Sequence, residues 1–174
     1  MAKGPNFKVK FRRRREGKTD YRHRLRLLKG ERPRAVVRVS RRRVLVALEA
    51  FDPEGDRVLA SAESRELAQL GFPSSSLNST PAAYLTGYLA GLRGKAQGVT
   101  EAVLDSGLLR PSPGGRILGA LKGLLDAGLE IPHGEPGFPS GDRLNGKHLK
   151  SPLPEPVEAY RGRLKPERPR REAS

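Results

Sequence analysis

The N-terminal quarter of the chain concentrates the side chains that bind phosphate. Lys and Arg make up 18 of the first 43 residues, against three Asp or Glu, whereas the remaining residues carry 16 charges of each sign. The whole formal net charge of +15 therefore lies before Val44. Arginine binds phosphate through two parallel hydrogen bonds and stacks on bases. A basic head on an electrically neutral body is typical of a segment that binds nucleic acid.

The candidate nucleic-acid-binding residues form two groups. The first group is interleaved with Phe7, Phe11 and Tyr21, and stacking on such rings contributes about 1–3 kcal/mol per base. The second group, residues 41–43, lies at a predicted hairpin corner, where binding loops are common. The full set is Lys8, Lys10, Arg12, Arg13, Arg14, Arg15, Lys18, Tyr21, Arg22, Arg24, Arg26, Arg41, Arg42 and Arg43. A nuclear-import tag is the alternative, but such tags are usually one cluster of about 5–8 residues.

Two other patterns resemble sites for chemistry, and neither is complete. Residues 17–19 (Gly-Lys-Thr) match the end of a phosphate-binding P-loop, but Arg12 stands where that motif needs a glycine. The three histidines lie far apart in the sequence, and the chain has no Cys to complete a zinc site. We therefore expect neither a P-loop nor a metal site, and polar or RNA-facing roles for the histidines. These are His23, His133 and His148.

Two aspartates, Asp105 and Asp126, each end an apolar segment. A pair of carboxylates can act as general acid and base. Neither aspartate has a nucleophile, a metal ligand or a histidine near it in the sequence, so we expect both to cap helices or turns instead. The sequence thus predicts no enzyme, no cofactor and no small-molecule substrate.

Composition excludes several other classes of protein. Without Cys there are no disulfides, which fits a reducing compartment. No run of 18 or more apolar residues is present, and the first residues lack the apolar region of a secretory signal. We therefore expect a protein of the cell interior that does not bind membranes.

The basic head is predicted to contain one helix, from Thr19 or Asp20 to Lys29. Either of the first two residues can cap it, and Gly30 ends it. Tyr21, Leu25, Leu27 and Leu28 form an apolar stripe at helical spacing. We expect this stripe to dock on a core while the arginines on the other side meet phosphate. The residues before Gly17 are too polar to pack alone and are expected to be extended.

The rest of the chain predicts an α/β domain. A β-hairpin and a third strand form an antiparallel meander over residues 34–39, 44–51 and 57–62. A helix over residues 81–97, capped by Ser79 or Thr80 with Pro81 in its first turn, leads to a strand over residues 102–104 and completes a β-α-β crossover. A second helix is predicted over residues 116–127, and a further short strand over residues 129–131.

These elements give a mixed β-sheet with helices packed on it, an extended basic N-terminal arm and a Pro-rich C-terminal tail. We divide the chain into a basic RNA-binding arm with the first helix (residues 1–30), a core domain (residues 31–131) and an extended Pro/Gly-rich tail (residues 132–174). The tail has too few apolar residues for a core of its own and is expected to be ordered only against something else.

The basic head favours RNA over DNA as its partner. The sequence contains no helix-turn-helix, zinc-finger or zipper pattern. Long Pro/Gly-rich or basic segments that flank a small core suit binding between RNA helices, because such segments fold on binding. An architectural or general nucleic-acid-binding protein is the alternative.

Several uncommon strings of residues resemble, in the same order, the eighteenth protein of the archaeal large ribosomal subunit. The strongest is the run of residues 12–21 (RRRREGKTDY), followed by residues 24–25 and 27–28. The others are residues 34–38 with Ser40, 82–91 (AAYLTGYLAG), 102–105, 121–123, 126–129 and 131–133, with Arg143, Gly146 and His148. The resemblance extends to about residue 150; beyond it, the Pro-rich basic tail departs from the acidic or helical ending of that family.

The resemblance implies a structural, non-catalytic protein that binds 5S rRNA in the central protuberance of the large subunit, in the cytoplasm. It implies 23S rRNA and the other 5S-binding protein of the large subunit as neighbours. The basic arm and first helix would hold the 5S rRNA. No catalytic residues are implied, because the family has none.

Overall fold

The computed structural model describes residues 4–134, 137–149 and 151–166. Within this part of the chain, the fold is built on a four-stranded sheet with the strand order β3-β2-β1-β4. The strands are β1 (Arg34–Val39), β2 (Val44–Ala50), β3 (Arg57–Glu63) and β4 (Val103–Asp105). The first three pair antiparallel, and β4 pairs parallel with β1. The predicted antiparallel meander and mixed sheet are confirmed.

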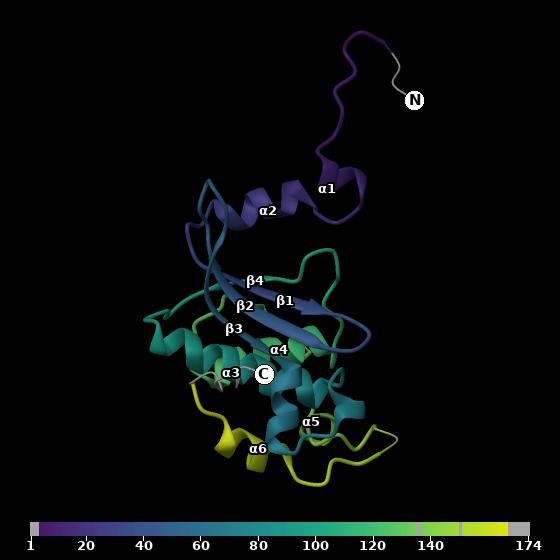
Figure 1. Cartoon of the computed structure of the whole chain (residues 1–174), viewed down its shortest axis with the longest axis vertical. Coiled ribbons are helices and arrows are strands. Elements are labelled where there is room, and N and C mark those ends of the chain that lie inside the picture. The colour runs from purple at the N-terminus through teal and green to yellow at the C-terminus, as the bar shows by residue number, and fades with distance from the viewer. Residues whose placement is uncertain (1–3, 135–136, 150, 167–174) are drawn as a thin grey trace, which may run out of the picture.

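Two long helices cover one face of the sheet: α3 (Thr80–Ala96) and α4 (Arg116–Asp126) (Figure 1). The chain reaches α3 from β3 through two short 3-10 helices, η1 (Ser64–Leu70) and η2 (Ser74–Ser76). As predicted, Ser79 caps α3 by accepting a hydrogen bond from the backbone N–H of Ala82, and a proline lies in its first turn. Because β4 follows α3 and lies beside β1, the predicted β-α-β crossover is also confirmed.

Glycines allow α3 and α4 to touch backbone to backbone. A Cβ atom added at Gly87 of α3 would lie 2.2 Å from the carbonyl oxygen of Ala120. One added at Gly123 of α4 would lie 2.1 Å from the carbonyl oxygen of Tyr84. No side chain fits at either position, so each glycine is required by the packing and not by its backbone angles.

The C-terminal part of the chain is more structured than the sequence predicts. It contains two short helices, α5 (Gly141–Leu144) and α6 (Val157–Arg163). Val157, Tyr160 and Leu164 are buried in the main core, and the ring of Tyr160 lies edge-on against Phe72 with 5.2 Å between centroids. The tail is thus ordered against the core of the same chain. The predicted extended tail also includes residues 135–136, 150 and 167–174, which lie outside the described residues.

The N-terminal part contains α1 (Arg12–Arg15) and α2 (Tyr21–Leu28). The helix predicted over residues 19–29 is confirmed, with Asp20 as its cap, whereas the single helical turn of α1 interrupts an arm that was expected to be extended. The prediction that the apolar stripe of α2 docks on a core is wrong, because α2 buries no residue and Leu25 is 59% exposed. Tyr21 packs instead against Phe11, 5.2 Å away between ring centroids.

The described segment after α4 does not form a further strand of the sheet. The strand predicted over residues 129–131 is wrong, because only an isolated bridge joins Glu130 to Glu101. In the described part of the chain, no helix combines the length and the apolar character that crossing a membrane requires.

Candidate nucleic-acid interface

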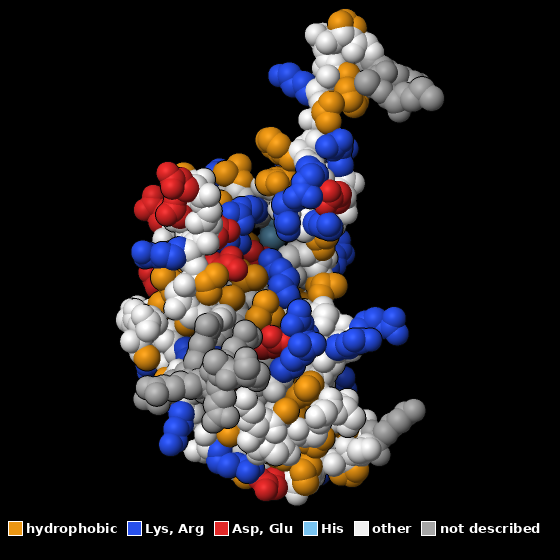
Figure 2. All heavy atoms as spheres, viewed as in Figure 1, with side chains coloured by type: hydrophobic (Ala, Val, Ile, Leu, Met, Phe, Trp, Pro, Cys, Tyr) orange, Lys and Arg blue, Asp and Glu red, His pale blue; other side chains and the backbone are white. Residues whose placement is uncertain are grey.

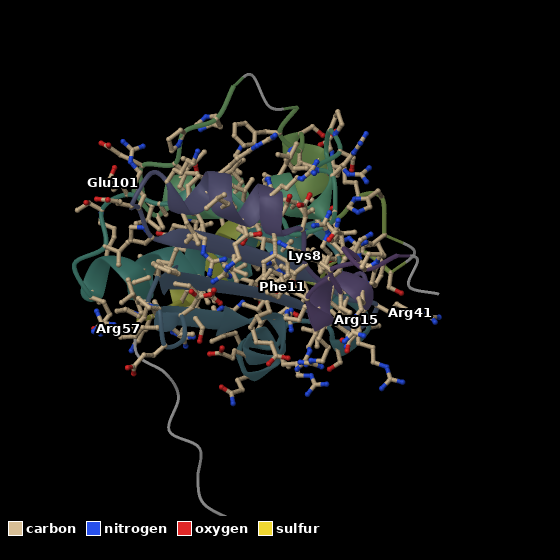
Figure 3. The ribbon with its side chains drawn as sticks, turned by 90° about the horizontal axis from the view of Figure 1, so that it is seen from above. Lys8, Phe11, Arg15, Arg41, Arg57 and Glu101 are labelled. Atoms are coloured by element: carbon tan, nitrogen blue, oxygen red, sulfur yellow. The ribbon has the colours of Figure 1, made fainter. Side chains whose placement is uncertain are left out.

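Basic side chains gather along one side of the molecule. In Figure 2 the Lys and Arg side chains follow the N-terminal segment and continue down the same side of the body, while Asp and Glu are densest at the opposite upper corner. Figure 3 shows Arg15 of α1 and Arg41 of the β1–β2 hairpin on the same side, away from Arg57 and Glu101. The fold therefore brings the two predicted groups of basic residues to one side. We call residues 4–30 the basic segment and residues 40–43 the basic corner.

Four successive arginines form the exposed turn α1. Arg12 and Lys18 share Glu16, at 3.2 and 2.9 Å, and Arg13 donates a hydrogen bond from its Nε to the Thr19 hydroxyl at 2.9 Å. Within the described residues, Arg15 makes no ion pair. One carboxylate cannot neutralise so many cations, so α1 keeps most of its positive charge for a partner.

The cap of α2 sets the direction of the next group of arginines. The Asp20 carboxylate accepts hydrogen bonds from the backbone N–H groups of His23 and Arg22, at 3.1 and 2.9 Å. The bond from His23 is the main cause that lowers the pKa of Asp20, so the cap stays charged at neutral pH. Arg22 and Arg26 are exposed on this helix, where they can reach a phosphate.

The basic corner is a turn held together by Ser40. The hydroxyl of Ser40 donates to the carbonyl of Arg43 at 2.9 Å and accepts from the backbone N–H of Arg43 at 3.0 Å and of Arg42 at 3.3 Å. Arg43 pairs with Glu63 at 2.7 Å, while the side chains at all three arginines remain exposed. The turn thus projects Arg41 and Arg42 into solvent from a rigid hairpin.

The structure adds one basic residue that the sequence analysis missed. The side chain of Asn78 donates to the carbonyl of Arg41 at 2.9 Å and accepts a hydrogen bond from Arg116, the first residue of α4. Arg116 therefore lies beside the basic corner although about 75 residues separate the two in the sequence. No local pattern could have predicted this, because only the packing of α4 under the sheet brings them together.

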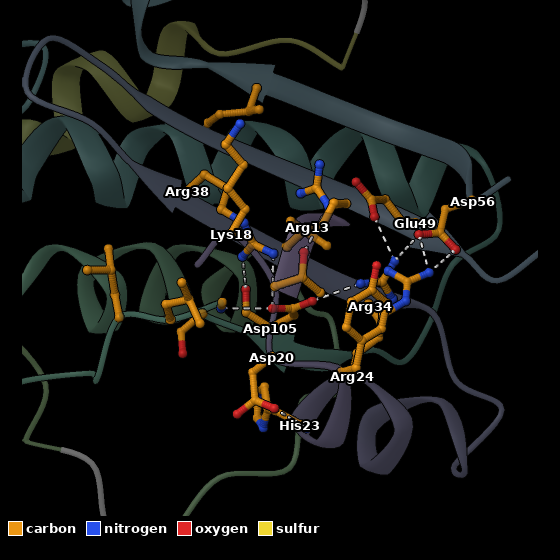
Figure 4. Close-up of a pocket in the computed structure, with 18 of the residues that line it drawn as sticks. Arg13, Lys18, Asp20, His23, Arg24, Arg34, Arg38, Glu49, Asp56 and Asp105 are labelled. Carbon is orange, nitrogen blue, oxygen red and sulfur yellow. Dashed lines mark hydrogen bonds and ion pairs between the residues drawn. The ribbon is translucent and has the colours of Figure 1, made fainter. Parts of the chain in front are cut away.

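A cleft of about 1000 Å³ separates the basic segment from the sheet face that α3 and α4 leave open. Its walls come from α2 and the residues before it, from β1 and β2, and from the loop after β4 (Figure 4). Leu45, Leu108 and Leu109 are exposed here, at 38%, 56% and 49%. Exposed apolar side chains rimmed by charges are typical of a surface that binds a partner.

A network of ion pairs crosses the bottom of this cleft. Arg34 of β1 is only 2% exposed and binds three carboxylates: Asp56 at 2.6 Å, Glu49 at 2.8 Å and Asp105 at 2.8 Å. Arg38 adds a bond to Asp105 at 3.1 Å. Alternation along β1 places Arg34 and Arg38 on the same face of the sheet, so their spacing in the sequence already indicates that they can share a partner.

The carboxylates of the network respond differently to burial. Burial opposes ionisation of Asp105, but the charge of Arg38, the Gly107 amide and the guanidinium hydrogen bonds outweigh it and lower the pKa. Burial raises the pKa of Glu49, and the charge of Arg34 offsets this only in part. Asp105 is therefore ionised at neutral pH, and it is the carboxylate that joins Arg34 to Arg38.

Arg24 has a different environment from the other predicted binding residues. Its guanidinium donates to both oxygens of Asp56, at 2.8 and 2.7 Å, and its side chain is 30% exposed. Arg24 is thus bound within the protein, whereas the sequence analysis placed it among the residues that neutralise phosphate. Lys8 and Lys10 lie in the exposed arm before α1.

The residues first considered for catalysis have structural partners. Asp105 accepts a hydrogen bond from the backbone N–H of Gly107 at 2.8 Å, as expected for a turn, in addition to its ion pairs. Asp126 does not cap a turn but accepts a hydrogen bond from the Tyr84 hydroxyl at 2.8 Å. Burial and this bond raise the pKa of Tyr84. Across the described residues, no cluster of three or more His, Asp or Glu is placed to hold a metal ion.

Comparison with known proteins finds close relatives over most of the chain. The model of the family described as ribosomal large subunit proteins 60S L5 and 50S L18 matches residues 5–97 and 92–134. Large ribosomal subunit protein uL18 of Korarchaeum cryptofilum is 52% identical over 151 residues, which is 87% of this chain and 77% of that protein. The uL18 proteins of Methanoregula boonei and Methanococcoides burtonii are 50% and 47% identical and cover 86% and 94% of this chain, with 85% and 97% of their own lengths.

Proposed function

The chain belongs to the uL18 family of large ribosomal subunit proteins, and from this premise we propose that it binds 5S rRNA through its basic segment and basic corner and anchors it to the large subunit. Membership of the family makes the protein a structural constituent of the ribosome that contacts rRNA in the cytoplasm. It also makes the protein a non-enzyme, since the family is not known to catalyse reactions.

The observation that carries the proposal is the position of the unneutralised charge. The four arginines of α1 and the two leading arginines of the basic corner are exposed, and Arg15 and Arg41 lie on the same side of the fold (Figure 3). Phosphate contacts supply most of the affinity of such proteins and fix their orientation, without reading the sequence. We assign phosphate contacts to Lys8, Lys10, Arg12, Arg13, Arg14, Arg15, Lys18, Arg22, Arg26, Arg41, Arg42 and Arg43.

Aromatic residues of the basic segment add a second kind of contact. Phe7 and Phe11 are 51% and 71% exposed, and Tyr21 packs against the ring of Phe11. Single-stranded or looped RNA offers unstacked bases for such rings, which duplex DNA does not. This favours RNA over the architectural DNA-binding alternative.

The choice of 5S rRNA follows from the family resemblance of residues 12–21. The same resemblance underlies three further parts of the proposal: a place in the central protuberance, contact with 23S rRNA, and contact with the other 5S-binding protein of the large subunit. The exposed apolar residues of the cleft are available for such neighbours.

The test is a binding titration of the whole chain against 5S rRNA, a tRNA and duplex DNA at two salt concentrations. If six to ten phosphates are contacted, affinity should fall by about 10³–10⁵ between about 50 and 200 mM salt, taking duplex DNA as the guide. We expect a preference for 5S rRNA of about tenfold or more that persists at the higher salt, because a shaped site survives screening better than a charged tail. Equal binding to all three, lost together in salt, would refute the proposal.

A further inference from the structure

We propose that Asp56 and the buried Arg34 form a clamp that holds Arg24 and thereby fixes the direction of the basic segment for rRNA. Arg24, Asp56 and Arg34 are then positioning residues, which act through the arginines that contact the RNA. The inference rests on the proposed function and deepens it, since it says how this protein orients its binding segment.

The clamp is a chain of short ion pairs that begins inside the body and ends on α2 (Figure 4). Arg34 binds Asp56 at 2.6 Å, and Asp56 in turn binds Arg24 with both oxygens. Three parts of the sequence meet here: α2, strand β1 and the turn before β3. The clamp therefore joins the basic segment to the sheet.

Burial makes this clamp stiffer than an ordinary surface ion pair. Exposed ion pairs contribute little to stability, because both side chains lose freedom in forming them and water screens their charges. Here Arg34 is 2% exposed and is also held by Glu49 and Asp105, so its position is set by the sheet. The Asp56 side chain is 18% exposed and is bound by Arg34, so its carboxylate is held in a fixed position where Arg24 can bind it.

The rest of α2 does little to fix its direction. The helix buries no residue, and its leucines are exposed or half-buried. An eight-residue helix without a buried face is marginal in water and gains its orientation from tertiary contacts. The ion pair in which Nη2 of Arg24 donates to both carboxylate oxygens of Asp56 is such a contact, and it ties α2 directly to the turn before β3.

The clamp predicts that removing the charge of Asp56 weakens RNA binding, whereas charge repulsion alone predicts that it strengthens binding. Removing an acidic charge close to an RNA-binding surface should strengthen binding, since less repulsion opposes the phosphates. Loss of Asp56 should instead weaken binding, because the basic segment must then be ordered at the moment of association.

The experiment compares Asp56→Asn with Glu54→Gln in the full chain. Glu54 lies in the same turn and lines the same cleft, but its carboxylate is not part of the clamp. For 5S rRNA we expect binding by Asp56→Asn to weaken by about fivefold or more. Binding by Glu54→Gln should be equal or slightly tighter, and Asp56→Glu should restore most of the affinity.

A second experiment measures how well the orientation of α2 is fixed in the protein without RNA. The chain has no Cys, so spin labels can be placed uniquely at Leu25→Cys on α2 and Glu158→Cys on α6, both exposed positions. The distance distribution between the labels should be narrow in the parent and in Glu54→Gln, and broad in Asp56→Asn. Arg24→Gln should also broaden it, whereas Arg22→Gln, which removes the same charge from an exposed position of the same helix, should not. These two variants keep the test valid should Asp56→Asn not fold.

The outcomes separate the clamp from the function on which it rests. If the parent shows no preference for 5S rRNA, the proposed function fails, and the label distances still test the clamp. If the parent binds 5S rRNA but Asp56→Asn binds as tightly or more tightly, with an unchanged distance distribution, the clamp is refuted while the proposed function stands.

Discussion

The body and the basic segment of this protein are built on opposite principles. The body, from β1 onward, buries a continuous apolar core between the sheet and the helices α3, α4 and α6. The basic segment buries no residue in either of its helices, and its charged side chains are exposed apart from Arg24, which Asp56 binds. Apolar burial supplies most of the stability of a fold, whereas long-range attraction to a polyanion needs exposed charge. The two requirements are met here by different parts of one chain.

This separation explains why the net charge is so uneven. A surplus of 15 positive charges spread over the body would repel itself and oppose compaction. Placed on a segment that contributes little to the core, the same charge costs the fold little. The clamp around Arg34 is where the two parts meet, and there the charges are matched by carboxylates.

The largest expected effect comes from reversing charge on the basic segment. Replacing Arg13, Arg14 and Arg15 by Glu should abolish 5S rRNA binding, with a loss of about a thousandfold or more, since it removes three charge-assisted hydrogen bonds to phosphate of about 1.5–3 kcal/mol each. Circular dichroism should show an unchanged melting transition of the body. Collapse of the body in this variant would contradict the separation of the two regions.

A change inside the body is expected to lower folding stability, which the charge reversal on the basic segment should leave unchanged. Gly87→Ala forces a methyl group against the backbone of Ala120 and should lower the free energy of unfolding by about 3 kcal/mol. Thermal melting measures this loss. Gly162→Ala in α6 is the matched control, because a Cβ atom there meets nothing within 4 Å, and its stability should be equal or slightly higher. A similar melting temperature for both variants would mean that α3 and α4 are not packed as described.

A smaller effect on binding is expected at the basic corner. Replacing Arg41 and Arg42 by Gln removes two exposed cations from a rigid turn and should weaken 5S rRNA binding by about a hundredfold, at about 1.5 kcal/mol for each lost bond to phosphate. The slope of the logarithm of affinity against the logarithm of salt concentration should also become shallower, by roughly one unit for each phosphate that the protein no longer neutralises. An unchanged slope would place the corner outside the interface.

The smallest effect concerns pH and lies at the boundary between the regions. The pKa of Asp105 is below its ordinary value of 3.8, so its ion pairs stabilise the fold above that pH and are lost as the pH falls through the lowered pKa. The pKa of Glu49 is raised in the folded protein, so the contribution of Glu49 to folding stability increases as the pH falls. Melting below about pH 4 should therefore be less pH-dependent in Asp105→Asn than in the parent. Equal pH dependence in the variant and the parent would show that the ion pairs of Asp105 do not stabilise the fold.

Patterns of neighbouring residues predicted the regular elements well. The β1–β2–β3 meander, the Ser79 cap of α3, helix α4 and the Asp20 cap of α2 all follow from local signals. These elements depend on turn residues, caps and periodicity, which a sequence displays directly. The two groups of basic residues were also visible, although their roles in binding stay predictions.

The remaining features depend on residues that are distant in the sequence. The clamp joins residues 32 and 22 positions apart, and only the folded sheet brings them together. The apolar stripe of α2 was expected to be buried, but periodicity cannot tell whether a surface exists for the stripe to cover. Helix α6 had a weak signal in Val157, Tyr160 and Leu164, which its Pro-rich surroundings concealed.

The most direct test of the separation of fold and binding is hydrogen exchange of the whole chain, alone and bound to 5S rRNA. We expect new protection on binding in the basic segment and the basic corner, because the bound RNA covers their backbone amides and reduces local opening. The amides of α3, α4 and α6 should exchange slowly in both states and change little. New protection concentrated on α3, α4 and α6, with none in the basic segment, would contradict the account.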